Sequence, residues 1–174
     1  LRLIRAADGY EVEKIDLGTY VASSPAYKQN RLYVGTFSNK VLAVNLEEQN
    51  IHWEYKHGKQ NFPFYSSPAV SNDLVVIGGR DKMIHGIDRT TGEGRWTFLT
   101  RSKIDSSPLI AGQVVFIAEA RGVVFGLDLV SGDLLWKYNT GSGIQASPAV
   151  SDSRLVISTV NGMVYCLGNE GSSP

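Results

Sequence analysis

The chain has 174 residues, and its 17 basic and 17 acidic side chains give a formal net charge of zero. This balance argues against a broad charged surface for nucleic acid or an anionic membrane, so no nucleic-acid partner is predicted. No apolar run approaches the roughly 20 residues of a membrane helix, so no transmembrane segment is predicted either. The single cysteine, Cys166, excludes an internal disulfide and a multi-thiolate zinc site.

A Ser-Pro motif recurs four times along the chain, at Pro25, Pro68, Pro108 and Pro148. The first interval between successive prolines is slightly longer than the other two, which are equal. A fixed period of about 40 residues is typical of stacked supersecondary units. We therefore interpret the chain as about four copies of one structural unit.

Each unit predicts short β-strands, and a further strand is expected at 12–17, before the first motif. In the unit 66–105, the β-branched run 74–77 is bounded by a glycine pair, and 83–88 alternates between the two faces of a strand. Both patterns are typical of half-buried or buried strands. The other predicted strands, in chain order, are 32–34, 41–44, 67–70, 95–98, 114–117, 123–127, 155–157 and 163–167.

Four short antiparallel strands in about 40 residues match one blade of a β-propeller. The sequence thus predicts an all-β fold, a β-propeller of four-stranded antiparallel blades. It would form a four-bladed ring or part of a larger propeller, for example an eight-bladed one. A single domain is expected over residues 1–170, with 171–174 as a tail. Its repeats are predicted at about 23–65, 66–105, 106–145 and 146–170, with 1–22 completing the last.

A second motif, small-x-Asp-x-x-Thr-Gly-x-x-x-Trp, repeats out of phase with the first. The Asp side chain caps a turn, the Gly takes the positive φ that the turn needs, and the Trp offers a large face to the neighbouring blade. Two copies are nearly complete and a third is weaker; their residues are Asp88, Gly92, Trp96, Asp128, Gly132, Trp136 and, in the weaker copy, Trp53. We predict that Trp96 and Trp136 are buried at blade junctions.

These residues resemble the repeat of the PQQ-like, or quinoprotein-type, β-propeller family, in which this motif is the tryptophan-docking motif that locks blade to blade. The resemblance covers about residues 3–168. WD40 and Kelch repeats match less well, because none of the three tryptophans is followed by Asp and the Gly-Gly doublet occurs once. Gly9 aligns with the turn glycine of the motif. Residues 12–17 would then be a fourth strand, available to pair with the third strand of the last unit, 163–167.

The sequence shows no complete catalytic site, and we predict neither catalytic nor metal-binding residues. His52, His57 and His85 lack the spacing of metal ligands, and the glycine-rich stretch 78–82 lacks the form of a phosphate-binding loop. Cys166 takes the small-residue position of a third strand, which predicts a buried thiol.

Binding is better supported than catalysis. In a propeller, the loops that lead into the first strands and the hairpin tips between the second and third strands share one face. The longest interval between the Ser-Pro motifs carries its extra residues in an aromatic loop, and repeat proteins place such insertions on their functional face. We predict a contact surface for a protein partner or small ligand on this loop face, formed by Phe62, Phe64, Tyr65, Arg80 and Arg121. The alternative is that the rings only fill the mouth of the central channel.

The resemblance implies two functions. Family members include the BamB-like lipoprotein of outer-membrane β-barrel assembly and scaffold domains, which favours a non-catalytic binding module without PQQ or calcium. The alternative is a fragment of a PQQ-dependent quinoprotein dehydrogenase, whose ring of about eight blades holds a quinone and a calcium ion. The resemblance alone suggests a periplasmic or extracytoplasmic location. Because the first residue is Leu1 and the first blade is incomplete, we expect a piece of a longer chain, or a chain that forms a homodimer.

Overall fold

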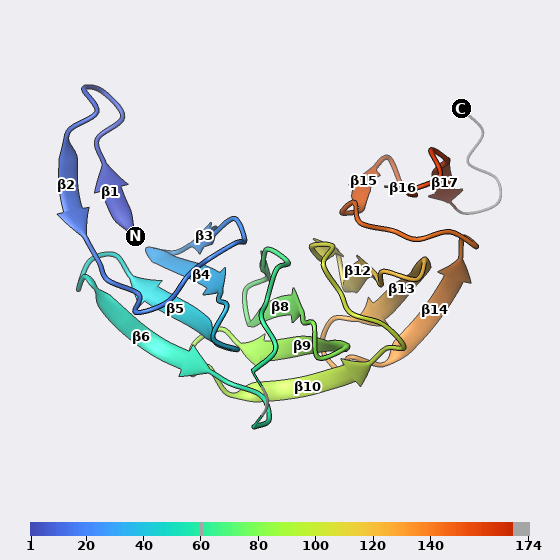
Figure 1. The fold of residues 1–174 in the computed structure, drawn as a ribbon, viewed down its shortest axis with the longest axis horizontal. Coiled ribbons are helices and arrows are strands. Elements are labelled where there is room, and N and C mark those ends of the chain that lie inside the picture. Colours follow the sequence, from blue (N-terminus) through green and yellow to red (C-terminus); the bar gives the residue numbers. More distant parts are fainter. Residues whose placement is uncertain (60, 169–174) are drawn as a thin grey trace.

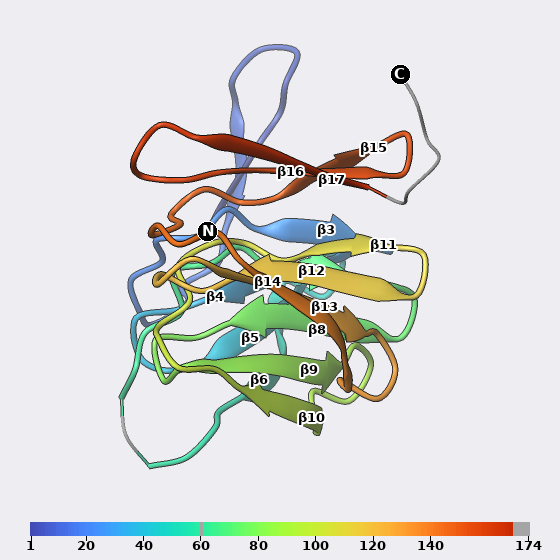
Figure 2. The same cartoon turned by 90° about the vertical axis from the view of Figure 1, so that its right-hand side faces the viewer.

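The computed structural model describes residues 1–59 and 61–168, and it confirms the all-β fold of antiparallel blades. The sheets follow one another along an open arc, with the N-terminal hairpin at one end and the last sheet at the other (Figure 1). Figure 2 views the arc from the side of this last sheet. The described residues contain no helix, and therefore none with the length and hydropathy to cross a membrane.

Three complete blades form the middle of the arc, and their strands are hydrogen-bonded in chain order. The first blade consists of β3 (Ala26–Lys28), β4 (Arg31–Gly35), β5 (Val41–Asn45) and β6 (Asn50–Tyr55). The second consists of β7 (Ala69–Val70), β8 (Leu74–Gly78), β9 (Met83–Asp88) and β10 (Gly94–Leu99). The third consists of β11 (Leu109–Ala111), β12 (Val114–Ala118), β13 (Val123–Asp128) and β14 (Leu134–Asn139).

Shorter sheets lie at the two ends of the arc. The hairpin of β1 (Arg2–Ile4) and β2 (Glu11–Lys14) precedes the first blade, and a three-stranded sheet follows the third. This last sheet consists of β15 (Ala149–Ser151), β16 (Arg154–Ser158) and β17 (Val164–Gly168). The predicted tail, 171–174, lies outside the described residues.

Burial falls from the middle strands of a blade to its outer strand. Every residue of β8 is buried, and so is every residue of β9 except Met83, whereas β10 alternates between exposed and half-buried positions. Neighbouring blades cover both faces of β8 and β9, which explains why β8 is a continuous apolar run and why even His85 of β9 is buried. The fourth strands β6, β10 and β14 lie on the convex side of the arc (Figure 1).

The Ser-Pro motif holds the inner strands together through its two serines. The first serine closes its own blade: Ser66 Oγ donates to Gly78 O at 2.9 Å and accepts from Gly78 N at 2.9 Å. The second serine joins blades, because Ser107 Oγ accepts a hydrogen bond of 2.9 Å from Ser67 N of the preceding blade. The same inter-blade bond links Ser24 N to Ser67 Oγ at 3.0 Å. Because the motif is repeated along the chain, the same inter-blade hydrogen bond forms at successive junctions.

The tryptophan-docking motif joins the same blades at their outer ends. Trp53 Nε1 donates to Arg89 O in the next blade at 3.0 Å, and Trp96 Nε1 donates to Leu129 O at 3.1 Å. The indole rings rest on the turn glycines of the next blade. Gly132 has φ +76°, and a Cβ there would lie 2.5 Å from the Trp96 ring. A side chain at this turn would therefore displace the ring that locks the blades.

The predicted burial of Trp96 and Trp136 is wrong in extent, because both are half-buried, whereas Trp53 is 7% exposed. One face of each indole covers the small residue of its own third strand, and a Cβ at Gly126 would lie 2.5 Å from Trp136 Nε1. The other face needs a turn from the following blade. For Trp136, the repeat spacing places that turn beyond residue 168, outside the described residues.

The Asp88 carboxylate organises the docking turn, and its ionisation is expected to show in the stability of the protein at low pH. Its Oδ1 accepts from Thr91 N at 2.8 Å and from Thr90 N at 2.9 Å, and its Oδ2 accepts from Arg95 at 2.6 Å. The backbone hydrogen bond from Thr91, followed by the bond from Arg95, lowers the pKa of Asp88 to about 2.

A folded-state pKa below the unfolded value of about 3.9 stabilises the fold above pH 4, and this stabilisation is lost as the pH falls towards 2. At neutral pH, the free energy of unfolding of Asp88→Asn should therefore be about 1 kcal/mol lower than that of the wild type, after allowance for the solvent-exposed Arg95 side chain. It should also lose less stability than the wild type between about pH 4 and pH 2. Urea melts across this range measure both effects; parallel curves for the two proteins would contradict the assignment.

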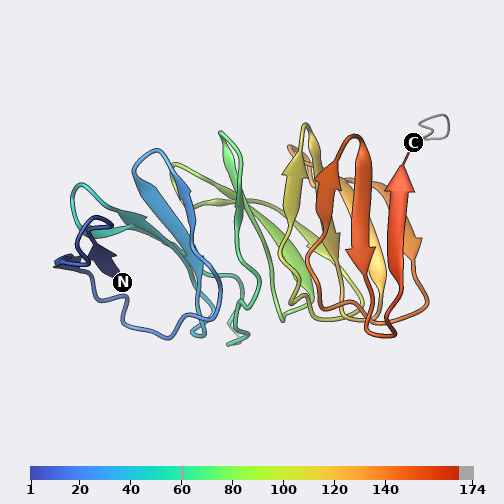
Figure 3. The same ribbon diagram turned by 90° about the horizontal axis from the view of Figure 1, so that it is seen from above.

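The ends of the chain do not pair as the repeat phase suggested. Residues 12–17 were expected to complete the last blade, but β2 pairs with β1, and β17 pairs with β16. Leu3 lies opposite Glu13 just as Gly86 lies opposite Trp96, so β1 and β2 are the third and fourth strands of a blade. The last sheet has its own third strand, β17, at one edge. Figure 3 shows the two ends at opposite sides of the arc.

The expectation of a buried Cys166 thiol is also wrong, since this residue is exposed. In the complete blades, the same third-strand position faces the tryptophan of the fourth strand, as Gly126 faces Trp136. The described part of the last sheet ends with its third strand, β17, so no indole covers Cys166 there. Burial at this position depends on the fourth strand and not on the third.

Candidate functional site

The loops at one edge of the arc are joined to one another by backbone hydrogen bonds. Phe64 N, in the loop that leads into the second blade, donates to Thr36 O of the first blade at 3.0 Å. Ile104 N, in the next such loop, donates to Gly79 O at 3.1 Å, and Ala120 N donates to Lys103 O at 3.0 Å. We call this edge the loop face. Its backbone is held in place by the blades on either side.

The structure does not bring the five predicted contact residues together on one surface. Phe64 is 1% exposed, so its predicted role in partner contact is wrong. It belongs to the core cluster with Tyr33 and Ile77, and a Cβ on Gly35 would lie 2.7 Å from the Phe64 Cβ. Its ring is a wedge between the first and second blades.

The position of Phe64 within the repeat explains this burial. It lies two residues before the first Ser of the motif, where the next two repeats have Ile104 and Ile144, which are 0% and 1% exposed. An alignment of the repeats on their prolines therefore contains the signal for a core position. The aromatic character of the loop favoured the contact interpretation over this core position.

The other predicted residues remain accessible. Phe62 is 39% exposed and Arg121 is exposed. Tyr65 is half-buried, and the Arg80 guanidinium lies 3.8 Å from its ring centroid. Arg80 also forms a fork with Asp105, with bonds of 2.7 Å and 3.0 Å to the two carboxylate oxygens. This stacking and pairing orient the guanidinium at the loop face.

Two exposed aromatic residues extend this arrangement into the first blade. The Phe37 ring packs against Tyr65 edge to face, with 5.0 Å between the ring centroids, and Phe37 N donates to Tyr20 O at 3.0 Å. Phe37 is 40% exposed and Tyr20 is 84% exposed. We call Tyr20, Phe37, Tyr65 and Arg80 the aromatic row. Phe37 was not among the residues predicted from the sequence, because it lies alone in the polar hairpin tip between β4 and β5.

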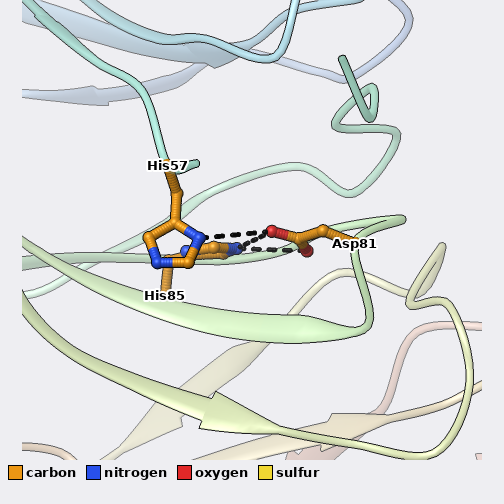
Figure 4. A group of neighbouring side chains, drawn as sticks. All are labelled: His57, Asp81 and His85. Atoms are coloured by element: carbon orange, nitrogen blue, oxygen red, sulfur yellow. Dashed lines mark hydrogen bonds and ion pairs between the residues drawn. The ribbon is translucent and has the colours of Figure 1, made fainter. Parts of the chain in front are cut away.

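A cluster of titratable side chains lies beside the aromatic row, between the first two blades. His57 comes from the loop after β6, Asp81 from the tip between β8 and β9, and His85 from β9 (Figure 4). His85 Nε2 is 3.1 Å from Asp81 Oδ2, and His57 Nδ1 is 3.8 Å from the same oxygen. The two imidazole rings are 5.2 Å apart between centroids. No local spacing in the sequence reveals this group, because His57 belongs to the preceding blade.

The surroundings of the cluster hold its side chains in place. His85 is 0% exposed, and its Nδ1 lies 3.1 Å from the Tyr55 hydroxyl. Burial, together with the negative charge of Asp81, raises the pKa of Tyr55 to about 12, so the phenol stays protonated. Burial alone would raise the pKa of Asp81, but the hydrogen bond from His85 and the charge of the imidazoles lower it overall. Asp81 therefore remains an anion beside two imidazoles.

Comparison with solved structures shows the propeller fold. BamB from Moraxella catarrhalis has 20% sequence identity and a TM-score of 0.77, covering 87% of this chain and 48% of the other. The quinohemoprotein alcohol dehydrogenase from Comamonas testosteroni has 16% identity and a TM-score of 0.70, covering 81% of this chain and 29% of the other. This chain thus spans about half of the BamB structure and less of the enzyme.

Comparison of sequences gives a relative and a family. The uncharacterized protein RC0314 of Rickettsia conorii (strain ATCC VR-613 / Malish 7) is 27% identical over 101 residues, which are 56% of this chain and 24% of that protein. The family model of outer membrane protein assembly factor BamB matches residues 1–173, almost the whole length. With the repeated docking motif and the arc of four-stranded blades, this match shows that the chain belongs to the BamB family of PQQ-like β-propellers.

Proposed function

We propose that this chain is part of a non-catalytic propeller that binds a protein partner through the aromatic row on its loop face. The observation that carries this proposal is the exposure of two aromatic side chains beside an oriented arginine on a rigid backbone. Aromatic residues and arginine are the commonest anchors of protein interfaces. A rigid surface also loses little conformational entropy when a partner binds.

Family membership suggests the process and the compartment. The family model is that of an outer membrane protein assembly factor, and we propose a role in that process, in an extracytoplasmic compartment. The arc is open, and this chain spans 48% of the BamB structure. We propose that further blades complete the ring, supplied by a longer chain or by a second copy; the mass of the native protein in solution distinguishes these arrangements.

The interaction is tested by removing exposed rings while leaving the core intact. In the native full-length protein, the double variant Tyr20→Ser/Phe37→Ser should capture outer-membrane assembly components at least about tenfold less well, because each ring contributes roughly 1 kcal/mol or more at an interface. Quantitative cross-linking in the source organism measures the capture, and thermal melts should show little change.

Leu99→Ser is the matched control, because Leu99 is 68% exposed on β10, on the convex side of the arc. This variant should bind like the wild type. Equal capture by the double variant and the wild type would place the interface elsewhere.

The fold similarity to a quinohemoprotein dehydrogenase keeps an enzymatic function as the second candidate. The native full-length protein, incubated with PQQ and Ca²⁺, should develop no quinone chromophore and no dye-linked alcohol oxidation if it is a binding module. Appearance of both signals would favour the quinoprotein function instead.

A further inference from the structure

We propose that His57, Asp81 and His85 form a binding site for a first-row divalent transition-metal ion such as Zn²⁺. The donor atoms would be His57 Nδ1, His85 Nε2 and an Asp81 carboxylate oxygen, which all lie within 4.8 Å of one another. Two imidazoles and one carboxylate are a common donor set for zinc and for iron(II). The site lies between two blades at the loop face, beside the aromatic row, and shares no residue with that row or with the docking turns.

The spacing of the donor atoms fits an ion without rearrangement of the blades. In a tetrahedral zinc site with bonds of about 2.0–2.1 Å, neighbouring donors are about 3.3 Å apart. Asp81 Oδ2 is 3.1 Å from His85 Nε2 and 3.8 Å from His57 Nδ1. Both of these distances lie within about half an ångström of that spacing, and the loop that carries His57 can adjust the position of its imidazole. In Figure 4 both imidazoles and the carboxylate point towards one another.

Hydrogen bonds from neighbouring groups would orient the donor side chains for a metal ion. Tyr55 Oη lies 3.1 Å from His85 Nδ1 and can accept a hydrogen bond from it in the tautomer whose Nε2 carries the lone pair for a metal ion. Asp81 Oδ1 accepts a hydrogen bond of 3.1 Å from Met83 N, which orients the carboxylate. Such supporting hydrogen bonds fix the tautomer and direction of metal ligands.

One atom of the cluster lacks a hydrogen bond. Asp81 Oδ2 is buried and has no hydrogen-bond partner among the described residues; its polar neighbours are the two imidazole nitrogens. A buried carboxylate oxygen in that condition is costly, and a bound cation would satisfy it. This orphaned oxygen is a second observation, independent of the donor spacing, that points to a cation.

The site is open on one side, so water can complete the coordination. The His57 side chain is 37% exposed, whereas those of Asp81 and His85 are 12% and 0% exposed. Mg²⁺ and Ca²⁺ prefer oxygen ligands, so the two nitrogen donors select against them. A bound ion would also tie the loop after β6 more firmly to the next blade, which His57 already contacts through Asp81 and His85.

The test uses the full chain without a polyhistidine tag, stripped of metal by a chelator. Calorimetric titration with Zn²⁺ should show a single ion per chain, and Co²⁺ should give the visible absorption bands of a nitrogen- and oxygen-bound ion. Mg²⁺ and Ca²⁺ should give neither. Zn²⁺ should also raise the Tm, since a ligand that binds only the folded state stabilises it.

The variants are His57→Gln and Asp81→Asn, with His52→Gln as the matched control. Loss of a ligand should weaken Zn²⁺ binding by about tenfold or more and abolish the increase in Tm. His52 is exposed on β6, so His52→Gln should bind Zn²⁺ like the wild type. His57 comes from an exposed loop, so His57→Gln should keep the wild-type circular dichroism spectrum. No Zn²⁺ binding by the wild type, or equal binding by His57→Gln, would overturn the proposal.

Discussion

Phe64→Ala is expected to lower the free energy of unfolding by about 3–5 kcal/mol, the usual range for a buried large aromatic ring. Phe64 is 1% exposed, and its ring fills the space between the first two blades, against Gly35, Ile77 and the edge of His85. Removal of the ring leaves a cavity that the rigid backbone cannot close, because Phe64 N is bonded to Thr36 O. Urea denaturation followed by circular dichroism measures the loss.

Phe62→Ala is the matched control, since Phe62 comes from the same loop and is 39% exposed. It should cost less than about 1 kcal/mol. If the two variants melted alike, Phe64 would not be the wedge between the blades, and the loop would contact a partner through both rings.

Trp96→Ala is expected to lower the free energy of unfolding by about 3 kcal/mol and to broaden the unfolding transition. The indole donates to Leu129 O and covers the turn at Gly132, so its loss removes both a hydrogen bond and an inter-blade contact. In repeat proteins, contacts between neighbouring units carry the cooperativity of unfolding. The second and third blades should therefore begin to unfold separately.

Trp136→Ala is the companion variant in the same chain, since this indole packs on Gly126 and Phe116 of its own blade. Calorimetry reports the enthalpy and the width of both transitions. A sharp transition for Trp96→Ala at the wild-type temperature would show that the serine contacts alone couple the blades.

The strands and their order could be predicted from the sequence because their causes are local. The apolar run of β8 and the alternation of β9 depend on side chains that are close together in the chain, and the repeat shows the same pattern in each blade. The docking turn could also be predicted, since the Asp88 carboxylate accepts hydrogen bonds from the amides two and three residues ahead of it. Such short-range contacts require particular residue types at fixed spacings, so they produce a regular pattern in the sequence.

The candidate sites could be predicted only in part from the sequence. The loop face was located from the repeat, and Arg80 and Tyr65 do meet there. Phe64 was assigned to the surface because an aromatic loop residue has no local signature of burial; the signal lies in the repeat, where Ile104 and Ile144 occupy the same position. The exposure of Cys166 likewise depends on whether a fourth strand lies beside β17.

The sequence by itself determined the blade, its four strands and the two motifs that join one blade to the next. Only the tertiary structure decided which side chains meet across a junction. His57 follows the last strand of one blade and His85 lies in the third strand of the next, so their approach depends on the angle and offset at which two blades stack. The pairing of β2 with β1 has a local cause instead, because a hairpin partner is adjacent in the chain and the other end of the arc is far away. A repeat specifies its own unit strongly, whereas contacts between units depend on packing that no single unit encodes.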